Sequence, residues 1–255
     1  MTGRNGSWTR SRVQTWPSIL RSLASLHGQP ARSPLPLGNH ADPNDEAVFI
    51  QLTYMTRSQR TVEAAFDDLR ALAPTSWTEL ADADPRRVAD AVRPLGLITR
   101  RTENLMSFGA QMADRHGGDL MTLDDLADAD LLKELMALPG LGPKGARCVA
   151  AYSFGRDVMA VDVHVLRVAK RLGMLEPSMT WARATRLIEE GVPAGLRYDA
   201  HVLLVQHGRE VCTQRAPACH ACPLVGRCPS AFIASDRRAD YVPELRHGTN
   251  GKGGN

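Results

Sequence analysis

The chain has 255 residues, of which 43% are hydrophobic and 23% charged, the composition of an ordinary globular protein. This length suffices for one large domain or two modest ones. No run of eighteen apolar residues is present, and the first twenty residues lack the apolar stretch of a signal peptide, so we expect neither a membrane protein nor a secreted one. Five cysteines are too few for a disulfide scaffold.

Charge is unevenly distributed along the chain, although the formal net charge is only +3. Residues 1–40 carry five arginines and no acidic residue, residues 41–137 carry a net −8, and residues 138–228 carry a net +5. Two basic blocks around an acidic one suggest that one face meets a polyanion. An acidic block that is simply a solvated helix surface explains the pattern equally well.

Local signals predict a chain that is almost entirely helical. Asp42 and Asp84 each precede a proline, a pattern typical of helix starts, and Ser58 is a further N-cap candidate. No segment alternates with the period of a strand. We expect helices from 42 to about 54, from 58, from 84 to just before 96, and over 99–116, 122–127, 130–137, 143–154, 162–171, 180–190 and 196–211. The first forty and last twenty residues are expected to be a partly ordered arm and a frayed tail.

Four of the five cysteines crowd into one short segment. Cys212, Cys219, Cys222 and Cys228 have the spacing C-x6-C-x2-C-x5-C, which predicts one metal or cluster centre. Structural zinc usually uses two C-x2-C knuckles, and only one is present, whereas a [4Fe–4S] cube tolerates wider gaps. We therefore favour the cluster over zinc. Cys148 lies in an apolar stretch and is expected to be an inert core residue.

The segment 138–145, LPGLGPKG, predicts a tight turn between two helices. Gly140 and Gly142 permit positive φ and a close approach of backbone N–H groups, and the helix that begins at Pro143 directs its free N–H groups into the same space. A DNA phosphate fits such a place, and contacts of this kind read no sequence. A helix–turn–helix packing joint is an equally good explanation of the turn.

Lys144 lies in the first turn of that helix. The positive end of the helix dipole and partial burial are both expected to lower the pKa of Lys144. A neutral amine can attack carbon and form a Schiff base, which arginine cannot do because it stays protonated. A lysine that only binds phosphate is the alternative.

Asp162 follows eighteen residues later, in the run MAVDVH. The helix from Pro143 leads the chain away, and the stretch 155–161 is long enough to bring it back. We therefore expect Asp162 near Lys144, where a carboxylate takes a proton from the amine or stabilises a cationic sugar. A plain helix N-cap is the alternative role.

In their order and distances, these motifs resemble the endonuclease III-type DNA glycosylases of the helix–hairpin–helix superfamily. The resemblance covers about 46–228 and is carried by LPGLGPKGA, AVDVHVLRVAKRLG, GLITRRTENL, HGGDL, the HGR run at 207–209 and the cysteine spacing. It implies that Lys144 is the catalytic lysine of the bifunctional members and that Asp162 is the catalytic aspartate.

The resemblance also implies an all-α fold of two helical domains that flank a DNA-binding groove. A six-helix barrel is expected over 46–156, with the helix–hairpin–helix at 130–155. Residues 1–45 and 157–255 are expected to form the iron–sulfur cluster domain, with disorder over 1–12 and 245–255.

The function implied by the resemblance is base excision repair. The expected protein is a monomer, cytoplasmic and nucleoid-associated, that binds double-stranded DNA with damaged bases or abasic sites. It flips out an oxidised pyrimidine, displaces the base through Lys144, and cleaves the abasic site by β-elimination from a Schiff base. The [4Fe–4S] cluster is expected to shape a basic loop. The residues expected to contact DNA are Gly140, Leu141, Gly142 and Gly145 of the hairpin, Arg215 and Arg227 of the cysteine segment, and Tyr54.

The sequence departs from the family pattern in two places. Where the family usually has a glutamine that fills the gap left by the flipped base, residues 53–57 read TYMTR, and Tyr54 is expected to stack there. Pro143 and Gly145 replace the commoner arginine and threonine around the lysine. The alternatives are a relative that acts on mismatched or deaminated bases, one that acts mainly as a lyase, and a non-catalytic protein that binds DNA structures.

Overall fold

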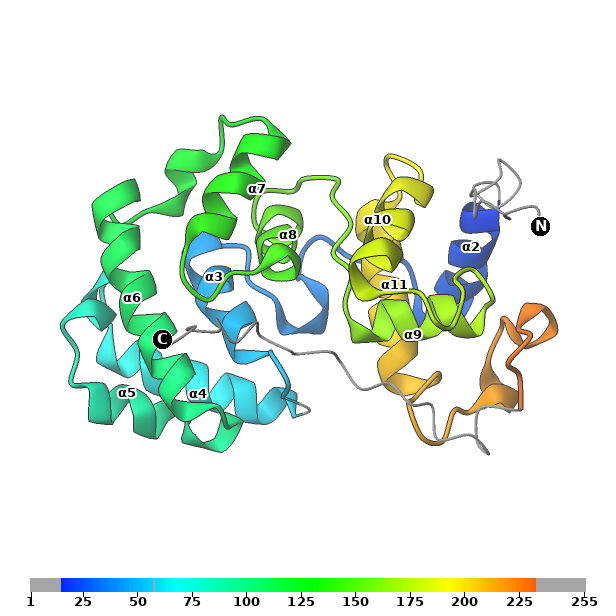
Figure 1. Cartoon of the computed structure of the whole chain (residues 1–255), viewed down its shortest axis with the longest axis horizontal. Coiled ribbons are helices and arrows are strands. Elements are labelled where there is room, and N and C mark those ends of the chain that lie inside the picture. The colour runs from blue at the N-terminus through cyan, green and yellow to red at the C-terminus, as the bar shows by residue number, and fades with distance from the viewer. Residues whose placement is uncertain (1–14, 57, 233–255) are drawn as a thin grey trace, which may run out of the picture.

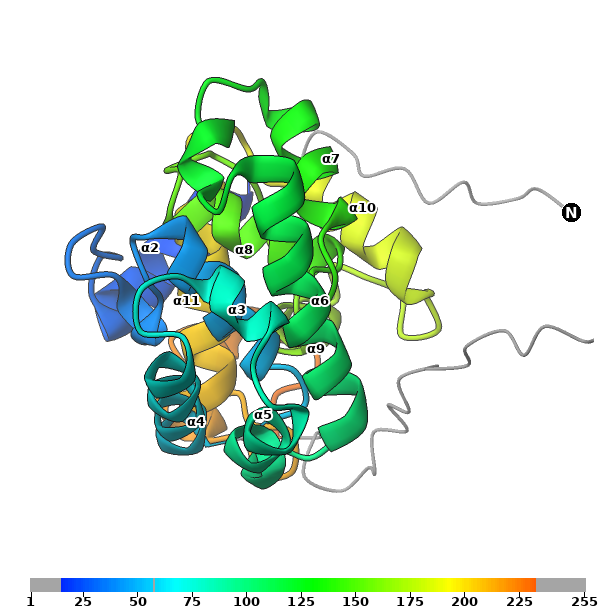
Figure 2. The same cartoon turned by 90° about the vertical axis from the view of Figure 1, so that its left-hand side faces the viewer.

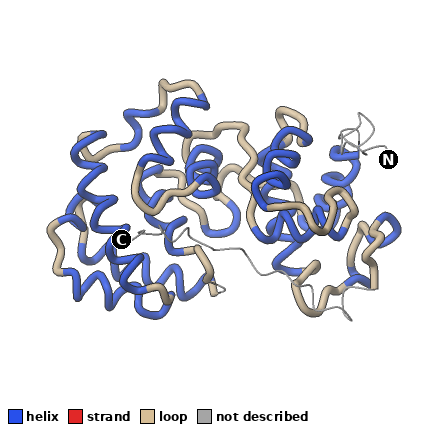
Figure 3. Tube along the Cα trace, in the orientation of Figure 1, coloured by secondary structure: helices blue, strands red, loops and turns tan. Residues whose placement is uncertain are grey.

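The computed structural model describes residues 15–56 and 58–232. Every regular element in these ranges is a helix, which confirms the all-α prediction (Figures 1 and 3). In the same ranges, each helix is too short or too polar to cross a lipid bilayer. The disorder expected over 1–12 and 245–255 concerns residues outside the described ranges.

The α-helices form two groups, with α3 to α8 on one side of the molecule and α2 with α9 to α11 on the other (Figure 1). Their bounds are α2 Thr15–His27, α3 Pro43–Leu52, α4 Gln59–Leu72, α5 Pro85–Val92, α6 Ile98–His116, α7 Asp128–Ala137, α8 Pro143–Tyr152, α9 Val163–Arg171, α10 Trp181–Gly191 and α11 Arg197–Glu210. Short 3-10 helices are η1 Pro36–Gly38, η2 Trp77–Ala81, η3 Arg93–Leu95, η4 Leu120–Leu123, η5 Cys219–Ala221 and η6 Val225–Arg227.

Helix α3 is the centre of the first group. Asp42 caps its N-terminus by accepting hydrogen bonds from the backbone N–H groups of Asn44 and Asp45, and Pro43 occupies the first turn. The helix packs against α4, α6 and α8, which surround it when the molecule is viewed from the end that carries α4 and α5 (Figure 2). Because α3 is buried on nearly all sides, it fixes where these neighbours lie.

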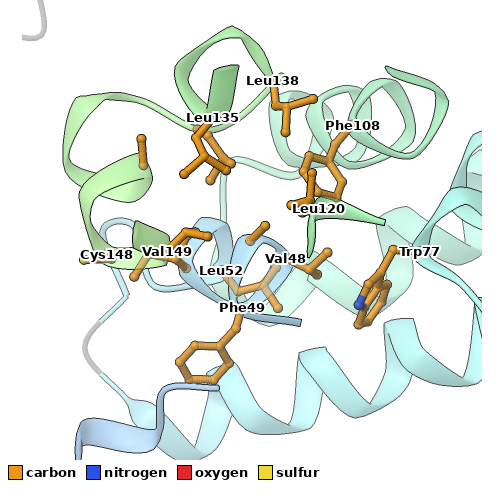
Figure 4. Close-up of a cluster of buried hydrophobic side chains, with 14 of the residues drawn as sticks. Val48, Phe49, Leu52, Trp77, Phe108, Leu120, Leu135, Leu138, Cys148 and Val149 are labelled. Carbon is orange, nitrogen blue, oxygen red and sulfur yellow. The ribbon is translucent and has the colours of Figure 1, made fainter. Parts of the chain in front are cut away.

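Two separate hydrophobic clusters stabilise the two groups. In the first, Phe49 and Leu52 of α3 lie with Phe108 of α6 and Val149 of α8 (Figure 4). The second is built from α2, α9, α10 and α11. Helix α11 contributes to both clusters, since its Tyr198 belongs to the first, so it ties the two groups together.

The prediction of a partly ordered N-terminal arm is wrong for residues 15–27. These residues form the regular helix α2, which packs against α11. Trp16 and Leu23 are completely buried there, and Leu20 is nearly so. Their spacing of three and four residues is the helical signal. It was obscured by the arginine, serine and proline residues around it.

Two local predictions are also corrected. The long helix α6 begins at Ile98 after Leu97, which adopts a left-handed conformation, so Thr99 is not its N-cap. The helix expected over 122–127 is replaced by η4, which Asp119 caps. Leu120 and Leu123 of η4 are buried in the first cluster, and this packing determines where the turn forms.

Candidate active site and cysteine pocket

A pocket between the two groups of helices contains both predicted catalytic residues. Lys144 from α8 and Asp162 from the start of α9 line it together. The other lining residues are Leu37, Asn39, Phe49, Ile50, Thr53, Cys148, Tyr152, His201, Val205 and Arg209. The prediction that the chain returns Asp162 to the neighbourhood of Lys144 is confirmed, while the catalytic roles of the two stay predictions.

Lys144 is positioned by the turn between α7 and α8. Gly140 has φ +80°, and a Cβ at this residue would collide with Oε1 of Gln51, so glycine is required. Gly142 is the N-cap of α8, and Pro143 starts the helix. This geometry places Lys144 in the first turn, as the sequence predicts.

The charge state of Lys144 differs from the expectation. Its amino group lies among protein atoms, and burial alone lowers the pKa of an amine. The opposing effect of Cys148, Asp162, Tyr54 and Glu46, which attract the ammonium when ionised, is larger, and the pKa of Lys144 is raised. The predicted lowering is therefore wrong, because it left out the acidic groups that α3, α8 and α9 bring to the lysine. The resting protein holds Lys144 as an ammonium.

Asp162 caps α9 and faces the same pocket. Its Oδ1 accepts hydrogen bonds from the backbone N–H groups of His164 at 2.8 Å and Val165 at 2.9 Å. Burial raises the pKa of Asp162, but the neighbouring histidines, Lys144 and the capping bonds together lower it below the ordinary value. The side chain is therefore a carboxylate at neutral pH and a poor proton acceptor.

Tyr152 and His201 are pocket residues that the sequence analysis missed. His201 is buried, and burial lowers its pKa to about 4, so the ring is neutral and its Nδ1–H donates to the carbonyl of Ala160 at 2.7 Å. The Tyr152 ring packs edge-on against His201 and Tyr198, and its hydroxyl is buried with no hydrogen-bond partner. A buried hydroxyl without a partner is uncommon in folded proteins, and this one lies in the pocket that holds Lys144 and Asp162.

Glu46 is a buried carboxyl beside the pocket, and it was also missed. It has no exposed surface, and it accepts hydrogen bonds from Nδ2 of Asn39 at 2.6 Å and from the backbone N–H of His40 at 2.8 Å. Burial raises the pKa of Glu46 to about 7, although both hydrogen bonds and Lys144 act to lower it. Glu46 therefore changes its protonation near neutral pH. The available signal was an acidic residue that directly precedes the apolar run 47–50, with Asp45 beside it.

Three residues expected to contact DNA, Tyr54, Gly145 and Leu141, are partly or wholly enclosed by the protein. The Tyr54 hydroxyl is buried, and a Cβ on Gly145 would collide with it, so Gly145 makes room for Tyr54. Leu141 is 3% exposed and belongs to the first hydrophobic cluster. Burial of the hydroxyl leaves Tyr54 only partly exposed, which disfavours the stacking role expected of it, and only the backbone of Leu141 and Gly145 is left for the hairpin surface.

The exposed side chains near Tyr54 belong to two other residues, Met55 and Leu97. Met55 is 71% exposed with φ +56°, and Leu97 is 53% exposed with φ +52°, so both hold the left-handed conformation that L-residues rarely adopt. Buried Arg101 joins the two turns, because its guanidinium donates to the carbonyls of Gln51 at 2.6 Å and Gly96 at 2.9 Å, and also to that of Tyr54. Two strained and exposed apolar side chains on a rigid support indicate a functional surface.

The four clustered cysteines line a second pocket, in the second group of helices. All four are free and partly exposed. Within residues 15–56 and 58–232, no three His, Cys, Asp or Glu side chains are arranged to hold a single metal ion. Nη1 of Arg171 donates to Sγ of Cys212 at 3.2 Å, and Nε2 of His207 lies 3.4 Å from Sγ of Cys222. Four thiols around one pocket, with a guanidinium N–H of Arg171 directed at one sulfur and a ring nitrogen of His207 beside another, fit the donor set of an iron–sulfur cluster.

The two arginines expected near the cluster are both exposed, which fits contacts with phosphates. Arg227 also donates from Nη1 to Oγ of Ser18 in α2 at 2.7 Å, so it links the cysteine segment to the N-terminal helix. The DNA contacts of Arg215, Arg227, Gly140 and Gly142 stay predictions.

Residues 54–194 match the family model of the HhH-GPD superfamily, which is described as base excision DNA repair proteins. That range is more than half of the chain and includes the hairpin, Lys144 and Asp162. The chain belongs to this superfamily. It is a base excision repair enzyme of the DNA glycosylase and AP lyase class.

Relatives of this HhH-GPD protein cover most of its length. Endonuclease III of Thermotoga maritima is 29% identical over 192 residues, which span 74% of this chain and 85% of that protein. Endonuclease III of Escherichia coli is 31% identical over 137 residues, 54% of this chain and 61% of that protein. A trapped endonuclease III–DNA covalent intermediate, an estranged-adenine complex, has a TM-score of 0.74 at 23% identity and covers 86% of this chain and 96% of that one. This last likeness shows the shared fold.

The raised pKa of Glu46 predicts an unusual pH dependence of stability. A carboxyl whose pKa rises on folding binds a proton more tightly in the folded state, so its contribution is complete below the unfolded pKa near 4.5 and is lost as the pH rises through about 7. Glu46→Gln should remove this dependence and stabilise the protein at pH 8 by roughly 3 kcal/mol relative to wild type, since each pKa unit corresponds to about 1.4 kcal/mol.

The free energy of unfolding, measured with denaturant at several pH values for both proteins, checks this. If the free energy of unfolding changes with pH by the same slope in wild type and Glu46→Gln, then Glu46 does not titrate near neutrality. Glu189→Gln is the comparison variant: Glu189 is a half-buried carboxyl that pairs with Arg147, and its pKa is also raised, so its removal should flatten the slope less than removal of the completely buried Glu46.

Proposed function

We propose that this protein is a bifunctional DNA glycosylase that removes oxidised pyrimidines and then cleaves the abasic strand through a Schiff base on Lys144. The observation that carries the proposal is the joint placement of Lys144 and Asp162 in the pocket between the two groups of helices. A DNA-binding protein without chemistry would need neither a lysine held among acidic groups nor a carboxylate facing it.

In the proposed mechanism, a damaged nucleotide leaves the duplex and enters the pocket. The neutral amine of Lys144 attacks C1′, the glycosidic bond breaks, and the base departs with the bonding electrons and a proton. The sugar ring then opens to a Schiff base, and loss of a proton from C2′ breaks the bond between C3′ and its phosphate oxygen. Asp162, held as a carboxylate, stabilises the positive charge that develops on the sugar. Water finally releases Lys144.

The duplex is proposed to lie across the hairpin and the cysteine segment. The N-terminus of α8, with Gly140 and Gly142 before it, offers backbone N–H groups to a phosphate. Exposed Arg215 and Arg227 supply positive charge to the same strand. The proposed protein works as a monomer on the DNA of the nucleoid. Oxidised pyrimidines are the lesion class implied by the resemblance of the sequence motifs to endonuclease III-type glycosylases, and a panel of damaged and mismatched duplexes tests it directly.

Lys144→Ala should abolish the covalent adduct that borohydride traps between this protein and abasic-site DNA, because no other amine lines the pocket beside Asp162 in the described residues. The adduct is measured as a shifted band on a denaturing gel. Lys133→Ala is the control, since Lys133 is exposed on α7 and should trap like wild type. An adduct of undiminished yield in Lys144→Ala, or none in the wild type, contradicts the proposed chemistry.

Met55 and Leu97 are proposed to fill the space that the flipped nucleotide leaves. Apolar side chains inserted between base steps kink and unstack the duplex. The thioether of Met55 is a weak hydrogen-bond acceptor and has no donor, unlike the amide of a glutamine. The orphaned partner base would therefore be held by stacking alone. The wedge expected at Tyr54 is therefore reassigned to its neighbour.

Met55→Ala should slow excision from a base-paired lesion on the order of tenfold, since each factor of ten corresponds to about 1.4 kcal/mol of lost support for the unstacked duplex. Cleavage at a preformed abasic site should fall much less, because no paired base must be displaced. Both rates are measured in single turnover, with Met121→Ala, exposed on η4, as the matched control. Equal losses on the two substrates would argue against a wedge.

The four cysteines are proposed to bind a [4Fe–4S] cluster. When bound, the cluster supplies a rigid cross-link, with no step of the cleavage assigned to it. The cross-link would fix the segment 212–228, together with Arg171 and His207, whose side-chain nitrogens lie against the sulfurs. Arg215 and Arg227 would then meet the DNA backbone from an ordered loop.

Cys222→Ser should lose the brown colour and the iron and sulfide content that the purified wild-type protein is expected to show. Iron, acid-labile sulfide and zinc are quantified in both proteins. Cys148→Ser is the matched control, because Cys148 lies in the first hydrophobic cluster and should keep the full iron content. Zinc in place of iron in the wild type would overturn the assignment.

A further inference from the structure

We propose that His27 orients His207 so that the imidazole of His207 donates a hydrogen bond to the sulfur of Cys222 when that sulfur binds the cluster. The inference rests on the proposed function, in which the four cysteines hold a [4Fe–4S] cluster. His27 lies in α2, outside the range 54–194 that matches the family model. Because it acts through His207, we regard His27 as a positioning residue.

Two buried histidines connect the N-terminal helix α2 with the cysteine segment. His27 is the last residue of α2, and its side chain is 3% exposed. Its Nε2 lies 3.1 Å from Nδ1 of His207 in α11, and Nε2 of His207 lies 3.4 Å from Sγ of Cys222. The two rings meet nearly edge to face, at an interplanar angle of 75°. Each ring nitrogen of His207 thus faces one partner, and the three side chains form a continuous row.

The direction of the hydrogen bonds in this row follows from the sulfur. Cluster iron binds cysteine as a thiolate, which accepts hydrogen bonds and donates none. The ring nitrogen of His207 that faces Cys222 must therefore carry a proton. Because His207 is completely enclosed, we expect its ring to be neutral, which leaves Nδ1 as an acceptor. The donor that Nδ1 requires is the Nε2–H group of His27. With the cluster bound, the row donates from His27 through His207 to Cys222.

Glu210 favours this direction from the other end of the row. Its Oε2 lies 3.3 Å from Nδ1 of His27, and its side chain is largely open to solvent. A carboxylate accepts hydrogen bonds and attracts positive charge, so it favours a proton on Nδ1 of His27 in addition to the one on Nε2. A histidine with both protons is an imidazolium, and Glu210 compensates its charge. Carboxylates commonly orient the histidines of metal sites in this way.

Helix α2 also contacts the cysteine segment at a second place. Oγ of Ser18, near the start of the helix, accepts a hydrogen bond from Nη1 of Arg227 at 2.7 Å. Leu224 is buried in the same hydrophobic cluster as Leu20 of α2. These contacts fix α2 against the segment independently of the histidines, and they therefore fix the position of His27 relative to His207.

A hydrogen bond to a ligand sulfur has two consequences for a bound cluster. It orients the ligand and so increases the affinity for the metal, as outer-shell partners do in other metal sites. It also stabilises the reduced cluster, which is the more negative form, and so raises the reduction potential. Without His27, the His207 ring is free to take the other tautomer and to direct a bare nitrogen at the sulfur. We therefore expect His27 to influence both the retention and the potential of the cluster.

The experiment measures how fast a chelator removes iron from the purified protein, and the reduction potential of its cluster. His27→Leu should lose iron on the order of tenfold faster than wild type and should have a lower potential. His27→Gln should lose iron at nearly the wild-type rate, because the glutamine amide can still donate to Nδ1 of His207. His116→Leu is the matched control, since His116 is a buried histidine of α6 in the first group of helices and should behave as wild type.

A double-variant cycle tests whether His27 acts through His207. His207→Leu removes the side chain that faces Cys222 and should lose iron at least as fast as His27→Leu. The protein that carries both substitutions should lose iron no faster than His207→Leu alone, because the effect of His27 requires the His207 ring. Circular dichroism of each variant monitors its helical content.

The outcomes separate the inference from the proposed cluster. A wild-type protein without iron sinks the proposed cluster and the inference with it. An iron-loaded wild type together with an unchanged His27→Leu leaves the cluster in place and overturns the role of His27. Equal defects in His27→Leu and His27→Gln would assign His27 to packing alone, and additive losses in the double variant would separate it from His207. Faster iron loss with a lower potential in His27→Leu, rescue by glutamine and non-additivity support the inference.

Discussion

The contact between α3 and α8 determines what Lys144 can do. It encloses the amino group among Cys148, Tyr54 and Glu46, and α9 adds Asp162 from the other side. A buried ammonium is stable only when negative charge compensates for its lost hydration. At neutral pH that charge comes from the Asp162 carboxylate and the ionised fraction of Glu46, because the raised pKa values of Cys148 and Tyr54 keep those two groups neutral. The same compensation keeps the amine protonated and therefore unreactive. Any nucleophilic role for Lys144 requires that the surrounding groups both hold this proton and provide a place for it.

The surface near the pocket depends on a second buried cation, Arg101. Its guanidinium bonds are directed at carbonyl groups of the turns that carry Met55 and Leu97. The Gln51 carbonyl belongs to the last turn of α3, where carbonyls lack helical partners, and the Tyr54 and Gly96 carbonyls belong to the turns beside Met55 and Leu97. A buried guanidinium is tolerable only with such acceptors around it. The hydrogen bonds of Arg101 thus stabilise the two strained turns, and the same bonds offset the cost of burying its charge. The result is a pair of apolar side chains held out from the protein at fixed positions.

The sequence predicted those parts of the site that depend on local geometry. The turn before α8, the cap of α9 at Asp162 and the helical content follow from glycine, proline and capping residues within a few positions of each other. It did not predict the sign of the Lys144 pKa shift, because the acidic groups responsible come from α3 and α9 as well as α8. Glu46 was missed for the same reason, since its partner lies in a different helix. The wedge role expected of Tyr54 came from its place in the run where the family usually has a glutamine, and such a match does not show where a side chain points. Helix α3 ends at Leu52, and the turn that follows buries the Tyr54 hydroxyl against Gly145 and exposes Met55.

The two carboxyl groups near Lys144 illustrate how environment assigns different chemistry to the same functional group. Asp162 keeps its charge because two backbone N–H groups bind one oxygen and the histidines and Lys144 lie nearby. Glu46 also accepts two hydrogen bonds, yet complete burial within the first group of helices outweighs them and favours the neutral acid. Paired groups whose pKa values are pushed apart commonly divide acid–base and electrostatic roles between them. Holding Glu46 as an anion above neutral pH therefore destabilises the fold, whereas the lowered pKa of Asp162 lets that residue carry its charge without such a cost.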